Sequence, residues 1–484
     1  MGKKAVPTLP HLARAASSFR HAEMAADARA ALADDAAYGL ARAMPSLSAH
    51  IVITAPQVAA LLFAAVAATA LSTFWPQTMW SALVALLSFG FVAGTLFRAG
   101  LACLGGWPRA TPHASDGEPL PVYTILVPLF REANVLPHLA RALMALDYPR
   151  DKLDIKIIVE EDDSETGAVA AEVAGNAPFE IVCVPAGRPQ TKPRACNYAL
   201  NFARGEFTVI FDAEDRPERD QLRKAAAAFR ASPSDTACLQ ARLNFYNADE
   251  NWLTRLFALD YALWFDVLLP GLDRLGVPMP LGGTSNHFRT AVLRQLGGWD
   301  PFNVTEDADL GIRIAHLGKR VAMLDSTTFE EAPVHFRVWL KQRSRWLKGY
   351  MQTWLVHTRR PLSLIHRAGL GGFLAFHLFV GGAVLSALAA PLLWALFAWS
   401  LFGPAHSGLS LSASSLIGGN ALLTVLAMAG PLRRGWRDLA PYGLTATLYW
   451  ALISLAALRG LGQLITNPFY WEKTAHGLSR QAAD

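Results

Sequence analysis

The sequence predicts an α/β domain with a mostly parallel sheet, flanked on both sides by membrane helices. Of the 484 residues, 52% are hydrophobic and only 17% are charged. The stretches 51–97 and 368–432 contain no charged side chain. Because about 20 apolar residues cross a bilayer as a helix, each stretch has room for two passes. The segment between them has ordinary charge content, so we expect it to form one soluble domain.

The central segment alternates between short β-rich apolar runs and helical patterns. The expected strands are 122–127, 155–159, 181–184 and 207–211, and the expected helices are 132–146, 168–174, 194–203 and 221–229. This alternation is typical of βαβ units and a parallel sheet. Ligands of such sheets bind beyond the carboxyl ends of the strands, so the residues that follow each strand are the candidates for chemistry.

Basic residues flank the first apolar stretch. Arg29, Arg42 and Lys3 are among those that precede it, Arg98 and Arg109 follow, and the link at 75–77 between its two halves is uncharged. The positive-inside rule therefore places the central domain in the cytoplasm, and the net charge of +5 reflects topology and not nucleic-acid binding. The four cysteines are isolated, which argues against a disulfide framework and a zinc site. The polar first 50 residues do not resemble a cleavable signal peptide.

Two further segments, 252–269 and 338–357, mix aromatic and charged residues and are predicted to be amphipathic helices in the membrane interface. Toward the C-terminus, 373–402 should leave the cytoplasm and 416–432 should return. The next segment has twenty residues without charge at 439–458, so hydropathy alone indicates a fifth span. Its proline, glycine and hydroxyl residues favour an interfacial or re-entrant helix instead, with four true spans and a cytoplasmic tail.

Acidic groups follow two of the expected strands, at 160–163 and at 212–215, and a third group includes Glu306 and Asp307. A diphosphate ester with a divalent cation needs hard oxygen ligands, which paired carboxylates supply. Transfer onto a sugar hydroxyl also needs a general base within hydrogen-bond reach. One acidic cluster alone is more often a solvated loop, but the order and spacing of all three predict a site.

These motifs resemble the processive family 2 glycosyltransferases, which include cellulose synthases, hyaluronan synthases and bacterial exopolysaccharide synthases. The resemblance runs from Pro121 to the C-terminus and is closest to the bacterial exopolysaccharide or adhesion synthases, whose metal motif reads Asp-Ala-Glu-Asp-Arg-Pro. It rests on Val-Pro-Leu-Phe-Arg-Glu at 127–132, the acidic run at 160–163, Lys192 with Asn197, Asp-Ala-Glu at 212–214, Thr-Glu-Asp at 305–307, and Gln342-x-x-Arg345-Trp346. It implies a GT-A (Rossmann-like) glycosyltransferase domain.

The resemblance also implies which residues bind the donor. Lys192 would approach the nucleotide or the diphosphate, and Asp212 with Glu214 would hold Mg²⁺ or Mn²⁺. The uracil end of the donor would lie against Pro128, Glu132 and the acidic run, through Asp162, Asp163 or Glu161. The run differs from the usual Asp-Asp-Gly, so its alignment stays open by a residue or two. Glu214 stands where many members have Asp, which keeps the carboxylate one methylene farther out.

On the acceptor side, the resemblance implies that Asp307 is the general base, next to Glu306. Gln342 and Arg345 would contact the diphosphate. Trp346 would stack on the acceptor sugar, beside Gly283 and Thr284 of a Gly-Gly-Thr-Ser-Asn run at 282–286. The segment 467–474 resembles the gating loop of cellulose synthases, although an interfacial aromatic belt explains it equally well.

We therefore divide the chain into a cytosolic cap (1–50), a transmembrane hairpin (51–101), a GT-A domain (118–335), an interfacial helix (336–367), two transmembrane helices (368–438), a third apolar segment (439–466) and a gating loop with tail (467–484). The implied activity is inverting transfer of a hexose from a UDP-sugar to a growing β-linked polysaccharide, with extrusion across the bacterial inner membrane. The expected partners are the UDP-sugar, the glycan, the bilayer and export proteins, with no nucleic acid.

Two alternatives remain for the function. One is transfer of a single sugar to a lipid acceptor, as in ceramide glucosyltransferases, which share the acidic motifs. The other is a non-catalytic membrane receptor or export component. A degenerate domain has no need to keep every acidic motif, which disfavours the second alternative.

Overall fold

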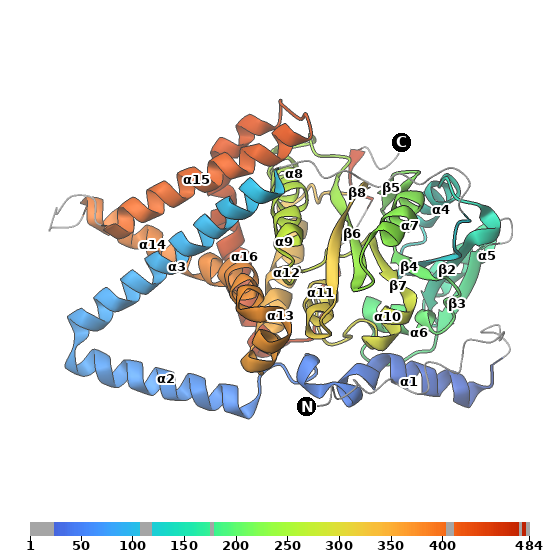
Figure 1. The fold of residues 1–484 in the computed structure, drawn as a ribbon, viewed down its shortest axis with the longest axis horizontal. Helices are drawn as coiled ribbons and strands as arrows, with labels where there is room; N and C mark the ends of the chain where they lie inside the picture. Colours follow the sequence, from blue (N-terminus) through green and yellow to red (C-terminus); the bar gives the residue numbers. More distant parts are fainter. Residues whose placement is uncertain (1–23, 107–118, 175–178, 403–410, 474–476, 481–484) are drawn as a thin grey trace.

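The computed structural model describes residues 24–106, 119–174, 179–402, 411–473 and 477–480. It consists of an α/β domain and, beside it, a group of long apolar helices (Figure 1). Helix α1 (Ala26–Ala43) runs along the edge of the α/β domain and is tied to it where the Asn197 side chain donates to the carbonyl of Ala36 (3.1 Å). The expected cytosolic cap is thus, in its described part, a helix that packs on the domain.

The domain is built on an eight-stranded sheet in the order β3-β2-β1-β4-β7-β6-β8-β5. Strands β1 to β4 are parallel, as are β6 and β8, while β7 and β5 run antiparallel to their neighbours. The mostly parallel sheet and all four expected strands are confirmed. The bounds are β1 Tyr123–Leu129, β2 Leu153–Glu160, β3 Phe179–Val184, β4 Phe207–Ile210, β5 Arg216–Pro217, β6 Thr236–Phe245, β7 Asn286–Arg289 and β8 Arg320–Glu330.

The sheet is covered on both faces, which explains why its central strands read as continuous apolar runs. In β1, Leu126 packs into one core while Ile125 and Val127 pack into the other, because successive side chains point to opposite faces. One face carries α4 (Leu136–Met144), α5 (Ser164–Ala174) and α7 (Gln221–Ala231); the other carries α6 (Lys192–Leu200), α8 (Trp252–Leu263), α10 (Thr290–Gln295) and α11 (Glu306–His316).

Helix α8 joins the domain to the apolar helices and continues through a π-helical turn into α9 (Leu269–Leu275). Its charged residues are paired across this junction. Asp260 pairs with Arg343 of α12 (Phe336–His357), and Asp266 in the π turn pairs with Arg434 at 2.5 Å. The polar residues of the segment 252–269 therefore hold the two parts of the molecule together.

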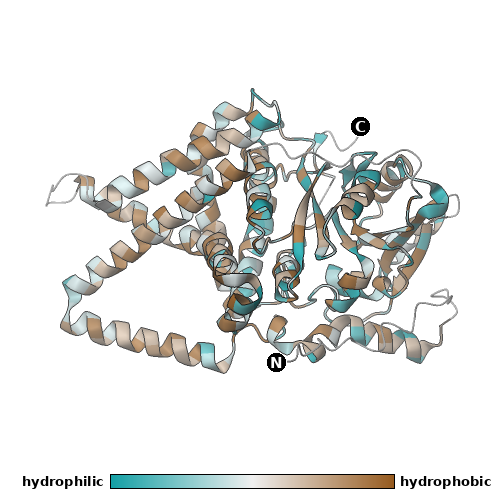
Figure 2. Ribbon diagram, in the orientation of Figure 1, coloured by the Kyte–Doolittle hydropathy of each residue, from teal (hydrophilic) through white to brown (hydrophobic). Residues whose placement is uncertain are grey.

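Five helical segments are long and apolar enough to cross a membrane, judged by length and composition among the described residues. Few strongly hydrophilic residues lie along them (Figure 2). They contain α2 (Ala55–Phe74), α3 (Pro76–Gly105), α13 (Pro361–Phe376) with α14 (Gly382–Phe402), α15 (Leu411–Arg433) and α16 (Ala446–Thr466). The segment 440–466, for which we predict an interfacial or re-entrant position, is among the five.

Four of these helices pack into a bundle, in which α3 contacts α14 and α15, α14 and α15 contact each other, and both contact α16. Helix α16 also lies along α12. There, a Cβ at Gly460 would come within 2.7 Å of the Ser344 carbonyl oxygen, so only glycine permits this close approach. This contact fixes α16, and with it the bundle, against α12, which carries the Gln-x-x-Arg-Trp motif.

Candidate functional site

A cavity of about 840 Å³ begins at the carboxyl ends of β1, β2 and β4. It continues past α11 and α12 into the space between α3, α14, α15 and α16. Most of the predicted site residues line it: Pro128, Glu132, Lys192, Asp212, Glu214, Gly283, Glu306, Asp307, Gln342, Arg345 and Trp346. Residues from six separate motifs thus meet at one place, as the position of strand ends in a parallel sheet predicts.

The proposed metal pair lies on the turn that follows β4. Asp212 and Glu214 line the cavity, whereas Asp215 points into the protein, where it accepts hydrogen bonds from the Asp212 amide (2.7 Å) and the Thr284 hydroxyl. Asp215 therefore shapes the turn that presents the pair. We predicted Thr284 on the acceptor side, but it is 1% exposed and does not line the cavity, because its hydroxyl is used to hold Asp215.

Lys192 begins α6 and reaches across to the same turn. Its ammonium pairs with Asp212 and donates to the Gly283 carbonyl oxygen at 2.8 Å. Burial alone would lower the pKa of Lys192, but Asp212 and Glu306 outweigh it and the net shift is upward. Lys192 is therefore a permanent cation at the point where a donor diphosphate would lie.

Glu330, at the end of β8, also lines the cavity, although sequence reasoning assigned it no role. Burial and the carboxylates of Asp215, Glu214 and Asp212 raise its pKa well above the usual range. Its position could have indicated a role, because Glu330 is an acidic residue at the end of a strand, like the acidic groups at 160–163 and 212–215. The strand itself, at 320–330, was not among the four expected from the sequence.

The acidic end of the cavity fits a divalent cation. Five of the carboxylates that line the cavity (Asp212, Glu214, Glu306, Asp307 and Glu330) interact electrostatically with Lys192, with Arg345 or with both. Their mutual repulsion leaves negative charge that a cation would neutralise. Among the described residues, no three acidic, His or Cys side chains are close enough to complete a metal site alone. A cation held by Asp212 and Glu214 would therefore need further oxygens from a bound diphosphate.

The predicted base stands in the first turn of α11. Glu306 is 5% exposed, whereas Asp307 is open to the cavity beside Gly283, where a Cβ would approach its Oδ2 to 3.5 Å. Burial raises the pKa of Asp307 to about 6, and burial with the charge of Asp307 raises the pKa of Glu306 to about 8. Asp307 is thus the accessible carboxylate and is ionised at neutral pH.

Helix α12 contributes six residues to the lining of the cavity, and Gln342, Arg345 and Trp346 of the predicted motif are among them. Burial lowers the pKa of Arg345 while Glu306, Asp307, Asp212 and Glu214 act in the opposite direction, so its guanidinium lies within the field of all four carboxylates. Trp346 stacks against Tyr261, with ring centroids 6.0 Å apart. It stands where the cavity passes from the domain to the apolar helices.

Three residues of the acidic run after β2, which we predicted to contact the donor, do not line the cavity. Asp163 accepts hydrogen bonds from the backbone of Arg131 (2.5 Å) and Thr166, and Glu161 accepts from the Ala186 amide (3.0 Å), so both are used by the protein itself. Asp162 accepts from Gln190 (2.9 Å). None of the three lines the cavity.

The residue of this run that does line the cavity is Glu160, the last residue of β2. Burial raises its pKa to about 7, although Arg194 acts against the shift. No feature of the sequence favours Glu160 over its neighbours, because the face to which a strand-end side chain points depends on the neighbouring strands.

The C-terminal segment lines the end of the cavity near Phe130 and Glu132. Lys473 donates to the Phe130 carbonyl oxygen and pairs with Glu132 at 3.4 Å. The Arg345 guanidinium lies 4.5 Å from the ring centre of Trp471. Both Trp471 and Lys473 line the cavity. The predicted gating segment therefore lies along the cavity up to Lys473, and its Thr474 lies outside the described residues.

Residues 120–349 match the family described as "Glycosyltransferase like family 2". These residues therefore form a domain similar to the family 2 glycosyltransferases. Together with its Rossmann-like sheet, this match identifies the domain fold as GT-A.

Among curated relatives, the chain is 24% identical over 233 residues to "Probable glycosyltransferase YdaM" of Bacillus subtilis, covering 48% of this chain and 55% of that protein. It is 29% identical over 289 residues to "Beta-monoglucosyldiacylglycerol synthase" of Trichormus variabilis, covering 57% and 60%. The chain thus spans little more than half the length of these relatives. A mannosyltransferase structure from Pyrobaculum calidifontis, in complex with GDP-Man and Mn²⁺, aligns with a TM-score of 0.49 at 23% identity, over 78% of this chain and 99% of that one.

Proposed function

We propose that this protein is a membrane-embedded, inverting hexosyltransferase that adds sugars from a UDP-sugar to a growing β-linked glycan. The observation that carries the proposal is the continuity of the cavity. One space contains the base, the cations and the acidic cluster, and it extends from there into the bundle of α3, α14, α15 and α16. A glycan that grows at Asp307 would leave through the space between these helices.

The side chains divide the chemistry between them. Asp307 takes the proton from the acceptor hydroxyl, whose oxygen then attacks the anomeric carbon as the bond to the diphosphate breaks. Lys192 and Arg345 stabilise the charge of the departing UDP. A Mg²⁺ or Mn²⁺ ion held by Asp212 and Glu214 would neutralise the diphosphate further. A single in-line displacement of this kind inverts the configuration and needs no covalent nucleophile.

The depth and lining of the cavity favour a glycan. On α14 the lining residues run from Ala383 to Trp394, about 17 Å of helix at ~1.5 Å per residue, against about 30 Å for the hydrocarbon core. Polar side chains inside a membrane bundle mark substrate paths, and this part of the cavity contains three, on three different helices. Aromatic rings suitable for stacking on sugars also line it. These residues are Ser386, Asn420 and Ser454, and Trp346, Trp394 and Trp450.

Membrane vesicles that contain the protein test the proposal directly. A panel of radiolabelled UDP-sugars is supplied with Mg²⁺ or Mn²⁺, and the products are sized and analysed for linkage. We expect a ladder of water-soluble polymer from one UDP-sugar. A product of one added sugar, at every donor concentration, would exclude chain elongation.

Transfer to a lipid acceptor is the second candidate. The cavity wall between the apolar helices is largely apolar. Two relatives at 29% identity are named beta-monoglucosyldiacylglycerol synthases. The same assay separates the two candidates, because a glycolipid partitions into organic solvent while a polymer remains in water. A protein with neither transfer nor UDP-sugar hydrolysis would instead support the non-catalytic receptor or export component.

The location proposed for the protein is the bacterial inner membrane, with the GT-A domain on the cytoplasmic side where UDP-sugars occur. The apolar helices support the membrane assignment, and the basic residues around the first hairpin support the orientation. Export of a polymer beyond this membrane would require partner proteins.

A further inference from the structure

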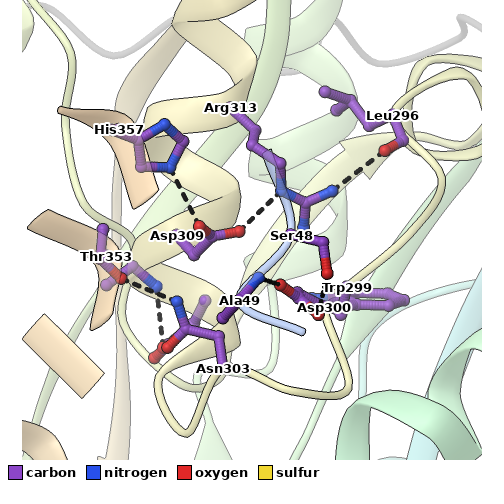
Figure 3. A network of polar contacts seen from close by, with 12 residues as sticks. Ser48, Ala49, Leu296, Trp299, Asp300, Asn303, Asp309, Arg313, Thr353 and His357 are labelled. Atoms are coloured by element: carbon purple, nitrogen blue, oxygen red, sulfur yellow. Dashed lines mark hydrogen bonds and ion pairs between the residues drawn. The ribbon is translucent and has the colours of Figure 1, made fainter. Parts of the chain in front are cut away.

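A buried polar network joins α11 and the loop before it to α12 and to the chain near Ala49 (Figure 3), and none of its labelled residues lines the cavity. Within it, Asp309 of α11 binds Arg313 (2.7 Å) and His357 of α12 (3.0 Å), and Asp300 binds the backbone near the first membrane helix. All four of these side chains are at most 1% exposed. The proposed reaction uses none of them, so the network has another role.

The network begins with the segment 45–52, which connects α1 to the first apolar helix. Arg359, just beyond α12, donates to five carbonyl oxygens of this segment, including that of Ser48 at 2.9 Å. Gln57, at the start of α2, donates to the Leu355 carbonyl oxygen at 2.8 Å. The chain is therefore fixed to the end of α12 at the point where it turns into α2.

Asp300 joins this segment to the loop before α11. Its Oδ2 accepts the Ala49 amide at 2.5 Å, and its Oδ1 accepts the Phe302 amide at 3.0 Å and the Ser48 hydroxyl at 3.3 Å. One carboxylate thus binds two segments that lie about 250 residues apart in the sequence.

The loop then passes this constraint to the base. Asn303 accepts the Thr305 amide at 3.0 Å and donates to Thr353 of α12 at 2.9 Å. Gln352 of α12 accepts the Val304 amide at 3.0 Å. Thr305 is the cap residue of α11, so the next residues are Glu306 and Asp307. Asp300, Asn303 and Val304, which precede the base, are therefore each held by a residue from another part of the chain.

The ring of Phe302 connects the same loop to the donor end. It contacts His50 of the N-terminal segment at 4.6 Å between ring centres and Phe469 of the C-terminal segment at 5.4 Å. The loop before the base is therefore packed between the entry to the membrane and the segment that covers the donor.

From these contacts we infer that the segment 45–52 is a clasp, and that Asp300 is a positioning residue that uses it to set the place of Asp307. The clasp lies on the path into the first membrane helix, so an incorrectly threaded N-terminus would leave the base out of place. The inference rests on the proposed role of Asp307. A base must stand within hydrogen-bond reach of the acceptor, and a misplacement of about 1 Å can lower the rate by about 100-fold.

The test compares Asp300→Ala with Asp154→Ala in the full-length protein. Asp154 is also a buried carboxylate of the domain, at 1% exposure, and accepts from Thr124 and the Arg204 amide, but it lies in β2 away from α11. We expect Asp300→Ala to lower kcat by about tenfold or more while the Kd for UDP stays within about twofold. Asp154→Ala should lower Tm comparably and keep kcat. Asp300→Asn, whose amide oxygen can still accept one backbone N–H, should give an intermediate kcat. If the alanine variant does not fold, the kcat of Asp300→Asn tests whether Asp300 positions the base.

A second readout does not depend on activity. Hydrogen exchange of the amides at 300–310 should be faster in the Asp300 variants than in wild type and unchanged in Asp154→Ala. A folded Asp300→Ala protein with wild-type kcat, or one that loses UDP affinity in parallel with kcat, would overturn the inference. So would unchanged exchange at 300–310. If wild-type protein transfers no sugar, the proposed function fails, and the exchange measurement still decides whether Asp300 fixes the loop.

Discussion

Glu306 and Asp307 are adjacent carboxylates with different surroundings, and this difference assigns their roles. Glu306 is buried against Lys192 and Arg345, while Asp307 opens to the cavity next to Gly283. Burial raises both pKa values, to about 8 and about 6. A general base must be ionised at working pH and must reach the acceptor, and Asp307 meets both conditions.

We expect Asp307→Asn to lower kcat by about 100-fold or more while the Kd for UDP stays within a few-fold, because a base acts on the acceptor and not on the nucleotide. In wild type, activity should fall as pH decreases through about 6, since protonation removes the base. Isothermal titration with UDP and initial rates across pH 5 to 8 provide both measurements. A UDP affinity that falls as steeply as the rate would contradict the assignment.

Asp212 and Glu214 should differ in how firmly they hold a metal. Asp212 also pairs with Lys192, so Asp212→Ala removes a cation ligand and releases Lys192 together. We expect this variant to lose metal-dependent donor binding outright, while Glu214→Ala regains part of it at high Mg²⁺ or Mn²⁺. Donor binding measured over a metal titration tests both. Normal metal-free donor binding by both variants would show that the cation site lies elsewhere.

At the scale of elements, the site depends on how α12 is supported. This helix contributes Gln342, Arg345 and Trp346 to the cavity, and α16 packs along its other side. The contact is close because Gly460 faces the backbone of Ser344 and Lys348. Glu472, which follows α16, pairs with Arg459 of that helix at 2.7 Å and anchors the segment that contains Trp471 and Lys473.

Gly460→Leu should therefore separate α16 from α12 and impair activity. A Cβ there would meet the Ser344 carbonyl oxygen at 2.7 Å, and overpacking of this kind typically costs about 1–3 kcal/mol. Gly462→Leu is the matched control, because a Cβ at Gly462 meets nothing within 4 Å. Thermal unfolding in detergent and the vesicle assay should show a defect in the first variant alone. Equal behaviour of the two would mean that this contact does not support the site.

At the scale of the whole molecule, the described tail at 477–480 lies on the catalytic domain. The amides of Gly477, Leu478 and Ser479 all donate to Glu331, at 2.5, 2.8 and 2.7 Å. If the tail and the domain share one side of the membrane, the chain must cross an even number of times between them. The segments containing α14, α15 and α16 offer three crossings by length and composition, so one of them would be incomplete. Its packing along α12 makes α16 our choice, which corresponds to four spans.

A cysteine at position 478 tests this topology in a background without the four native cysteines. Leu478 is 44% exposed, whereas Ser479 is 6% exposed and would be protected in either arrangement. We expect a membrane-impermeant thiol reagent to leave Leu478→Cys unlabelled in intact cells and to label it after permeabilisation. Ready labelling of intact cells would restore a fifth span and remove the tail from the donor site.

The parts of the site that the sequence predicted were those where residue type and local position determine the role. Asp212 and Glu214 follow a strand that periodicity identifies, Arg345 lies on a predicted helix, and the structure brings them into one cavity with Asp307. The site predictions that failed concern side chains whose direction the sequence does not determine. Thr284 lies one residue from Gly283 yet points into the protein, and Glu160 lines the cavity instead of Asp162 or Asp163.

By itself, then, the sequence determined the α/β class, the four leading strands, the apolar helices and the motifs that meet at the site, because strand and helix periodicities are local properties of the chain. Only the tertiary structure decided the place of Glu330, the bundle of helices around the cavity and the clasp that Asp300 forms with residues 45–52. Each of these depends on contacts between segments far apart in the sequence. The Ala49–Asp300 hydrogen bond, for example, leaves no mark in the residues on either side of it.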